Sequence, residues 1–75
     1  MVRYQNLGGN SGVYAYEIGN GNITVQFNDG ATYLYTTASA GTYNISYMQQ
    51  LAVAGRGLNS FISTTVKKGY ATKLR

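Results

Sequence analysis

Hydrophobic and polar residues alternate along the first half of the chain, in three short segments separated by turn-forming residues. The segments are residues 13–18 (VYAYEI), 23–27 (ITVQF) and 31–36 (ATYLYT), and their period of two predicts β-strands. Between them lie residues 19–22 (GNGN) and 28–30 (NDG), which are rich in residues that tolerate the positive φ angles of tight hairpins. We therefore expect a three-stranded antiparallel meander.

After residue 41 the spacing of hydrophobic residues becomes helical. Asn44 is a favourable helix N-cap, and hydrophobic residues then recur every three or four positions. These residues are Ile45, Met48, Leu51 and Ala52. Residues 55–57 (GRG) interrupt the pattern, and a second helix is expected from Leu58 to about Lys68. Gly69 follows at the position of a C-cap glycine, with basic residues in the last turn.

These elements predict an α+β fold of the order β-β-β-α-α, in which the two helices pack on one face of the sheet. Residues 1–12 are expected to form a flexible N-terminal segment, because they are rich in Gly and Asn, and residues 13–75 a single domain. The opposite face of the sheet is rich in Thr and Tyr, and is expected to face water or a second subunit.

Composition limits how such a small domain is stabilised. The chain has 75 residues, no Cys and no His, and Glu17 and Asp29 are its only acidic residues. A disulfide is thus excluded, and a zinc site, which takes its ligands from Cys, His and carboxylates, is not expected. Because small domains commonly need an additional source of stability, we expect a homo-oligomer. We expect no metal and no cofactor.

The chain is expected to be cytoplasmic, in a bacterium or in a phage-infected cell. Its first residues contain no apolar run of signal-peptide length. No segment approaches the length of apolar sequence that spans a membrane, so no membrane association is expected. The absence of Cys agrees with a reducing compartment.

Positive charge is concentrated in the last third of the sequence. Residues 1–55 have a formal charge of −1, whereas residues 56–75 contain five Lys and Arg and no acidic residue, a charge of +5. This asymmetry favours an anionic partner that contacts the C-terminal segment. The alternative is a solvated basic face that keeps the protein soluble.

An enzyme is not expected. General acid–base catalysis needs a group with a pKa near neutrality, most often His or paired carboxylates. Asp29 lies in a turn that selects Asp for its conformation, which leaves Glu17 without a partner. Hydroxyl nucleophiles need a neighbouring base, and Lys is the only one that the composition offers.

Two groups of residues are candidates for ligand binding. The first is the junction between the helices, where Arg56, Gly57, Asn59 and Ser60 place a guanidinium and backbone N–H groups at a helix start, suited to an anion. The alternative is an ordinary helix–helix turn with Asn59 or Ser60 as its cap. The second group comprises Lys67, Lys68, Tyr70 and Lys73, with Tyr33 and Tyr35 on the third strand. Tyrosines can stack on bases, but Tyr33 and Tyr35 can equally pack beneath the helices.

The chain resembles the KTSC domain, a small domain found at the C-terminus of some lysyl-tRNA synthetases. Tyr33-Leu34-Tyr35 is similar to the family's Tyr-x-Tyr on the third strand. Gly55 to Ile62 (GRGLNSFI) is similar to its Gly-x-x-x-Asn-x-x-Ile pattern. The likeness covers about residues 13–70 and implies a meander followed by helices, with a role in binding RNA or a nucleotide. Stand-alone members resemble small bacterial and phage proteins.

Three functions remain open from the sequence. The first is a non-catalytic, oligomeric protein that captures a phosphate-bearing small molecule, in particular a nucleotide, as a phage protein that sequesters a host signalling nucleotide would. The second is a module that binds RNA or single-stranded nucleic acid through the basic C-terminal segment, with strong salt dependence. The third is a protein-interaction factor or an inhibitor of a host enzyme.

Overall fold

Two tight turns fold the middle of the chain into the expected meander. The computed structural model describes residues 1–9 and 11–75. Its central strands are β2 (Val13–Gly19), β3 (Asn22–Phe27) and β4 (Thr32–Thr36), all antiparallel. Gly21 and Gly30 adopt φ angles of 72° and 91° in the two connections, a region that glycine enters at little cost. The three strands and both turns that the sequence predicts are therefore confirmed.

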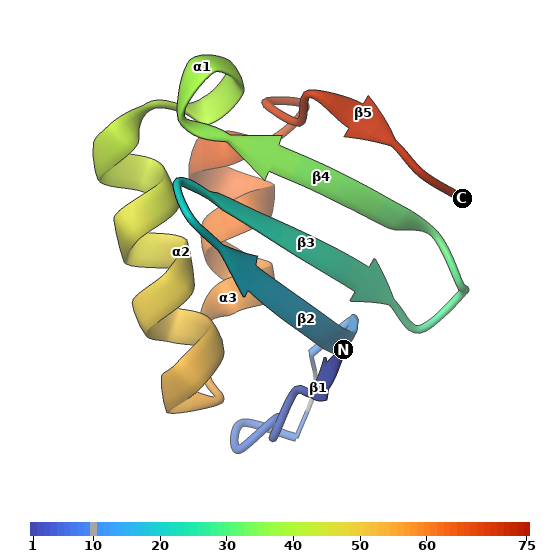
Figure 1. Cartoon of the computed structure of the whole chain (residues 1–75). Coiled ribbons are helices and arrows are strands. Elements are labelled where there is room, and N and C mark those ends of the chain that lie inside the picture. The colour runs from blue at the N-terminus through green and yellow to red at the C-terminus, as the bar shows by residue number, and fades with distance from the viewer. Residues whose placement is uncertain (10) are drawn as a thin grey trace.

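The predicted three-stranded meander followed by two helices is nevertheless wrong, because the sheet has five strands. Two short strands, β1 (Val2–Arg3) and β5 (Thr72–Lys73), pair antiparallel with β2 and β4 and give the order β1-β2-β3-β4-β5 (Figure 1). Four strands thus precede the helices and one follows them. Neither two-residue strand is long enough to show an alternating pattern, and main-chain hydrogen bonds define both. The broader α+β class stands.

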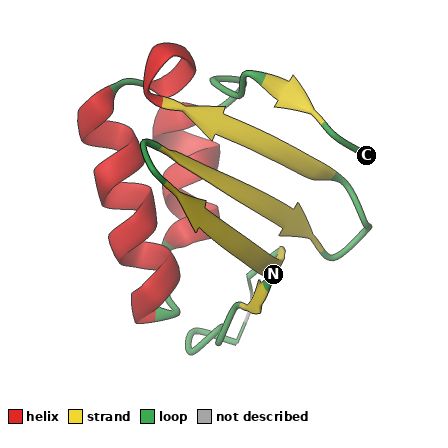
Figure 2. Ribbon diagram, in the orientation of Figure 1, coloured by secondary structure: helices red, strands yellow, loops and turns green. Residues whose placement is uncertain are grey.

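The helices all cover one face of this sheet (Figure 2). They are α1 (Thr37–Ala40), α2 (Thr42–Ala54) and α3 (Leu58–Phe61), and α3 continues as one π-helical segment, η1 (Ile62–Val66). The last helix thus ends at Val66, two residues earlier than expected, and Lys67 follows it with a φ of 52°. Among the described residues, no helix combines the length and apolar character needed to cross a bilayer.

The core lies between β3 and the helices. In the antiparallel register Ile23 is opposite Tyr35 and Val25 is opposite Tyr33, so all four side chains point to the helical face. Ile23 and Val25 are completely buried, as is Met48 of α2. Burial of this face brings α2 and α3 over the sheet and determines where the connection between them lies.

Tyr4 joins the N-terminal segment to this core. Its side chain is 3% exposed, and its hydroxyl accepts a hydrogen bond of 3.3 Å from the backbone N–H of Leu58, at the start of α3. Its own backbone N–H donates to the carbonyl of Tyr14 at 3.0 Å. Within the segment 1–12, predicted to be flexible, residues 2–4 therefore pair and pack. Asn10 of that segment lies outside the described residues.

Replacing Tyr4 by Phe should lower the free energy of unfolding by about 1–2 kcal/mol, because the buried N–H of Leu58 loses its acceptor while the ring remains. Urea denaturation followed by circular dichroism measures the change. Tyr14→Phe is the matched control, since Tyr14 is exposed. Equal stability losses in the two variants would contradict the proposed role of the Tyr4 hydroxyl.

Candidate functional site

The connection between α2 and α3 and the N-terminal segment enclose a small hollow of about 170 Å³. One wall consists of four residues that the sequence singled out as candidates, and the structure brings them together as expected. They are Arg56, Gly57, Asn59 and Ser60. The other wall comes from the N-terminal segment and consists of Tyr4, Asn6, Gly8 and Ser11. We call this cavity the Arg56 hollow.

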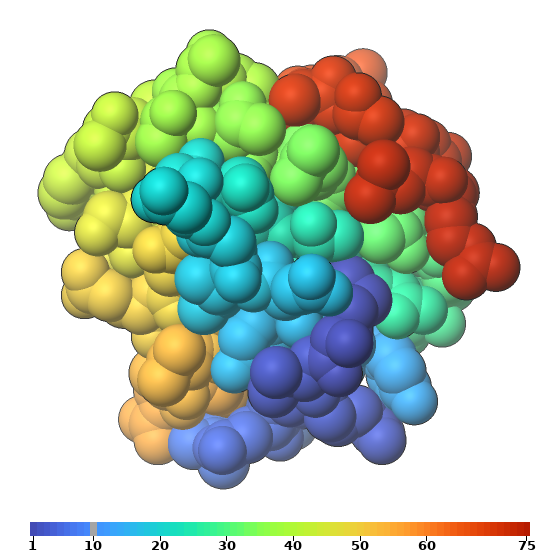
Figure 3. All heavy atoms as spheres, viewed as in Figure 1, coloured from blue at the N-terminus to red at the C-terminus, as the bar shows by residue number. Residues whose placement is uncertain are grey.

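A hydrogen bond joins the two walls of the hollow, since the backbone N–H of Leu7 donates to the carbonyl of Gly55 at 2.7 Å. A second bond lies within the N-terminal wall, where the backbone N–H of Ser11 donates to Oδ1 of Asn6 at 3.0 Å. In the space-filling view the blue N-terminal segment lies directly against the orange end of α2 (Figure 3). Gly55 ends α2 with a φ of 78°, and a Cβ atom there would lie 2.7 Å from Cβ of Gln5. This close approach requires glycine.

The chemistry of the Arg56 hollow suits an anion. Arg56 is exposed, and it is the one charged residue among the described residues that line the hollow. Asn6, Asn59 and Ser60 add neutral polar side chains. The sequence suggested that backbone N–H groups at this helix start could bind a ligand. The N–H of Leu58 cannot, because it already donates a hydrogen bond to the Tyr4 hydroxyl. The guanidinium of Arg56, with five donors in a fixed fork, is the one cationic donor group among the described residues that line the hollow.

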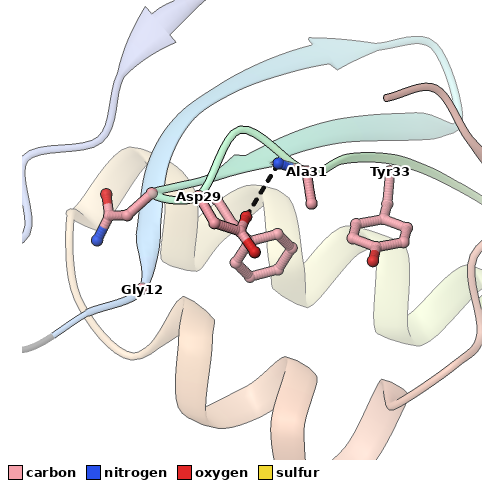
Figure 4. A pocket seen from close by; sticks show the side chains of 6 residues that line it. Gly12, Asp29, Ala31 and Tyr33 are labelled. Atoms are coloured by element: carbon pink, nitrogen blue, oxygen red, sulfur yellow. Dashed lines mark hydrogen bonds between the residues drawn. The ribbon is translucent and has the colours of Figure 1, made fainter.

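A second, larger hollow of about 470 Å³ lies beside the first, at the turn between β3 and β4. Its walls include the rings of Phe27 and Tyr33, which meet edge to face with their centroids 5.7 Å apart. Asp29 is also part of the wall, and its Oδ1 accepts a hydrogen bond of 2.9 Å from the backbone N–H of Ala31 (Figure 4). We call this cavity the aromatic hollow.

The two hollows meet at Gly12. A Cβ atom on Gly12 would lie 3.3 Å from Oδ1 of Asn59, which lines the Arg56 hollow. It would also lie 3.9 Å from Cδ1 of Phe27, which lines the aromatic hollow. The side chains of Asn59 and Phe27 therefore pack around Gly12 and separate the two hollows, which lie side by side on the surface. The combined surface has a cation at one end and two aromatic rings at the other.

The predicted tyrosines form an aromatic cluster at the edge of this surface. The ring of Tyr70 lies 4.6 Å from that of Tyr33 and 6.2 Å from that of Tyr35, measured between centroids. Nζ of Lys73 lies 5.8 Å from the centre of the Tyr33 ring, within the range of a cation–π interaction. Tyr35 is buried in the core. Tyr33 lines the aromatic hollow and thereby connects the cluster to it.

Lys67 and Lys68 do not join the Arg56 hollow. They follow η1, whereas Arg56 precedes α3, and the intervening helical residues separate them by on the order of 13 Å. Both lysines are exposed. The ten predicted site residues thus divide into the Arg56 wall, the tyrosine cluster with Lys73, and this lysine pair.

Sequence reasoning missed half of the surface. Asn6, Ser11 and Gly12 belong to the segment expected to be flexible, and Phe27 and Asp29 were assigned to strand and turn roles. The one sequence signal for Asn6, Ser11 and Gly12 is the unusual density of Gly and Asn in residues 5–12. Among the described residues, no group of three or more His, Cys, Asp or Glu is placed to hold a metal ion.

The chain was compared with protein-family models, curated proteins and solved structures, and no match was found. The resemblance to the KTSC domain therefore stays a prediction that rests on the residues quoted above.

The stability of the protein should fall between pH 10 and pH 12 because of Tyr35. Burial, with smaller contributions from Tyr33 and Tyr70, raises the pKa of its hydroxyl to about 12 from the ordinary value of 10.0. Above pH 10 the unfolded chain releases this proton while the folded chain retains it, so unfolding becomes more favourable. Below pH 10 the effect is absent.

Urea denaturation at pH 9, 10, 11 and 11.5 tests this expectation, with Tyr35→Phe as the control that has no ionisable group at the same buried position. The wild-type protein should lose more stability with rising pH than the variant. Parallel curves for the two proteins would contradict the raised pKa.

Proposed function

We propose that this protein is a non-catalytic binding protein for a nucleotide, with the phosphate in the Arg56 hollow and the base in the aromatic hollow. The observation that carries the proposal is the closeness of the two hollows, whose lining residues Asn59 and Phe27 both pack against Gly12. It places a cationic and an aromatic surface within reach of one small molecule.

The charge of Arg56 supports a phosphate in the Arg56 hollow. Arg56 has no acidic residue beside it among the lining residues, so its guanidinium is available to an external anion. A guanidinium binds a phosphate through two parallel hydrogen bonds, an arrangement that is stronger than a neutral contact. The amides of Asn6 and Asn59 supply further donors and acceptors around it.

The size and the lining residues of the aromatic hollow support a nucleobase there. The volume of the aromatic hollow, about 470 Å³, is in the range of small-molecule sites. Phe27 and Tyr33 offer aromatic surface to a planar ring, and Asn28 and Asp29 offer polar groups at its edge. A nucleobase matches both properties, whereas inorganic phosphate alone would leave the aromatic surface unused.

Capture without turnover is the activity that this composition favours. The two carboxylates of the chain lie apart, Glu17 on β2 and Asp29 in the turn after β3, and nothing in the sequence supplies a general base of the usual kind. The proposal therefore includes sequestration of a signalling nucleotide, by an oligomer and in a phage-infected cell. The likeness to the KTSC domain supports the choice of a nucleotide ligand.

Arg56→Ala should weaken nucleotide binding by about tenfold or more, because a charge-assisted hydrogen bond to phosphate contributes about 1.5–3 kcal/mol. Isothermal titration with purine and pyrimidine nucleotides measures the affinity, after native mass spectrometry of the purified protein has identified any retained ligand. Lys68→Ala is the matched control, since it removes one exposed positive charge far from the hollow. Equal losses in both variants would indicate general charge attraction and contradict the proposal.

The junction itself is tested with Gly12→Val. A side chain there would project between Asn59 and Phe27. The crowding that it imposes on Asn59 and Phe27 should lower the affinity for nucleotides, while thermal denaturation checks that the variant keeps its fold. Unchanged nucleotide binding would contradict a ligand that spans both hollows.

A further inference from the structure

A second aromatic surface lies on the helical side of the molecule. Tyr43 and Tyr47, one turn apart on α2, stack with their centroids 6.2 Å apart and their planes 11° apart. Phe61 of α3 meets Tyr47 edge to face, with a centroid distance of 4.8 Å. We call these three residues the aromatic ladder.

The ladder is exposed to an extent that packing of the core does not explain. Tyr43 is 76% exposed and Tyr47 is 38% exposed. The buried residues of α2 are Ile45, Met48 and Ala52, which already cover the sheet. Tyr47 and Phe61 connect the two helices, and Tyr43 extends the row outward into solvent. Phe61 is half-buried against the core, so the exposed part of the row consists of Tyr43 and the outer side of Tyr47.

The charged residues of the helical layer are all basic. Residues 30–75, which include all three helices and η1, contain no acidic residue. Lys67 and Lys68 lie in the turn after η1, and this turn packs beside α1, since a Cβ atom on Gly69 would lie 3.4 Å from the carbonyl oxygen of Ser39. Tyr43 lies in the first turn of α2, which begins two residues after the end of α1. The turn after η1, which contains the two lysines, and the start of α2, which contains Tyr43, lie at the same end of the helical layer (Figure 1).

We infer that the aromatic ladder, with Lys67 and Lys68, binds single-stranded nucleic acid. Successive bases stack on aromatic side chains without regard to sequence, and neighbouring cations contact the phosphates. The bases must be unpaired, because a duplex keeps its ring faces inside the stack. Charge complementarity selects this occupant, since a polyanion meets lysines and no carboxylate on the helical face.

This surface is separate from the nucleotide site. Asn59 and Ser60 line the Arg56 hollow, whereas the next residue, Phe61, contacts Tyr47 of α2. One side of α3 therefore lines the Arg56 hollow, and another side contacts α2 through Phe61. The inference does not rest on the proposed nucleotide binding, and each stands or fails by its own variants.

The ladder is tested with a fluorescein-labelled 12-nucleotide RNA, followed by fluorescence anisotropy. Tyr43→Ala should weaken binding by about fivefold to a hundredfold, the range for loss of one base-stacking contact. Tyr43→Trp should retain or improve binding, whereas Tyr43→Leu, apolar but without a ring face, should bind as weakly as Tyr43→Ala. The high exposure of Tyr43 means that all three variants should fold, which thermal denaturation checks.

The lysines are tested through salt dependence. Changing both Lys67 and Lys68 to Ala should reduce the slope of log affinity against log salt concentration by about 1.4, since each phosphate contact with a single strand contributes about 0.7. Arg56→Ala, the variant that disables the nucleotide site, should leave binding of the 12-mer nearly unchanged.

Four results would overturn the inference. The first three are no binding of the single-stranded 12-mer, equal affinity for the same sequence as a duplex, and full affinity in Tyr43→Leu. The second and third would mean that base stacking on the ladder does not drive the interaction. Loss of binding in Arg56→Ala alone would place the RNA in the Arg56 hollow and would also overturn it.

Discussion

The structure depends on burial of the helix-facing side of β3. Ile23 and Val25 are completely buried there, and each such side chain contributes on the order of 1.5–3 kcal/mol. With no cysteine in the chain, these apolar contacts have no covalent support. They require α2 and α3 to lie over the sheet, which sends the Gly55–Gly57 connection to the end where β2 begins. The position of the Arg56 hollow follows from that packing.

The parts of the fold that could be predicted are those where the hydrophobic pattern is repeated enough to define a period. Strands β2, β3 and β4 and helix α2 each contain several alternating or helically spaced apolar residues. Strands β1 and β5 contain two residues each, and Val2 and Lys73 have no pattern of their own. Their partners on β2 and β4 define them, so the sequence could not indicate them before the sheet was known.

The same difference applies to the candidate site. Arg56, Gly57, Asn59 and Ser60 are close in the sequence, and their glycine-rich turn was recognisable as a candidate. The opposite wall comes from residues more than forty positions earlier, such as Asn6 and Ser11, which face it only after Tyr4 is buried under α3. Charge alone grouped Lys67 and Lys68 with Arg56, but the helix between them sets them at opposite ends.

The placement of charge also determines how a nucleotide would be oriented. The carboxylate of Asp29 is part of the wall of the aromatic hollow and would repel a phosphate there, while Arg56 would attract it at the other end. At the same time, Asp29 is an acceptor for the amino groups of a base. Reversing the ligand would place phosphate against carboxylate and leave the guanidinium without an anion. Lys73 and Arg75 line a further hollow together with Asp29 and offset part of this repulsion. Arg56, whose hollow has no acidic residue among its described lining residues, is therefore what favours this direction of binding.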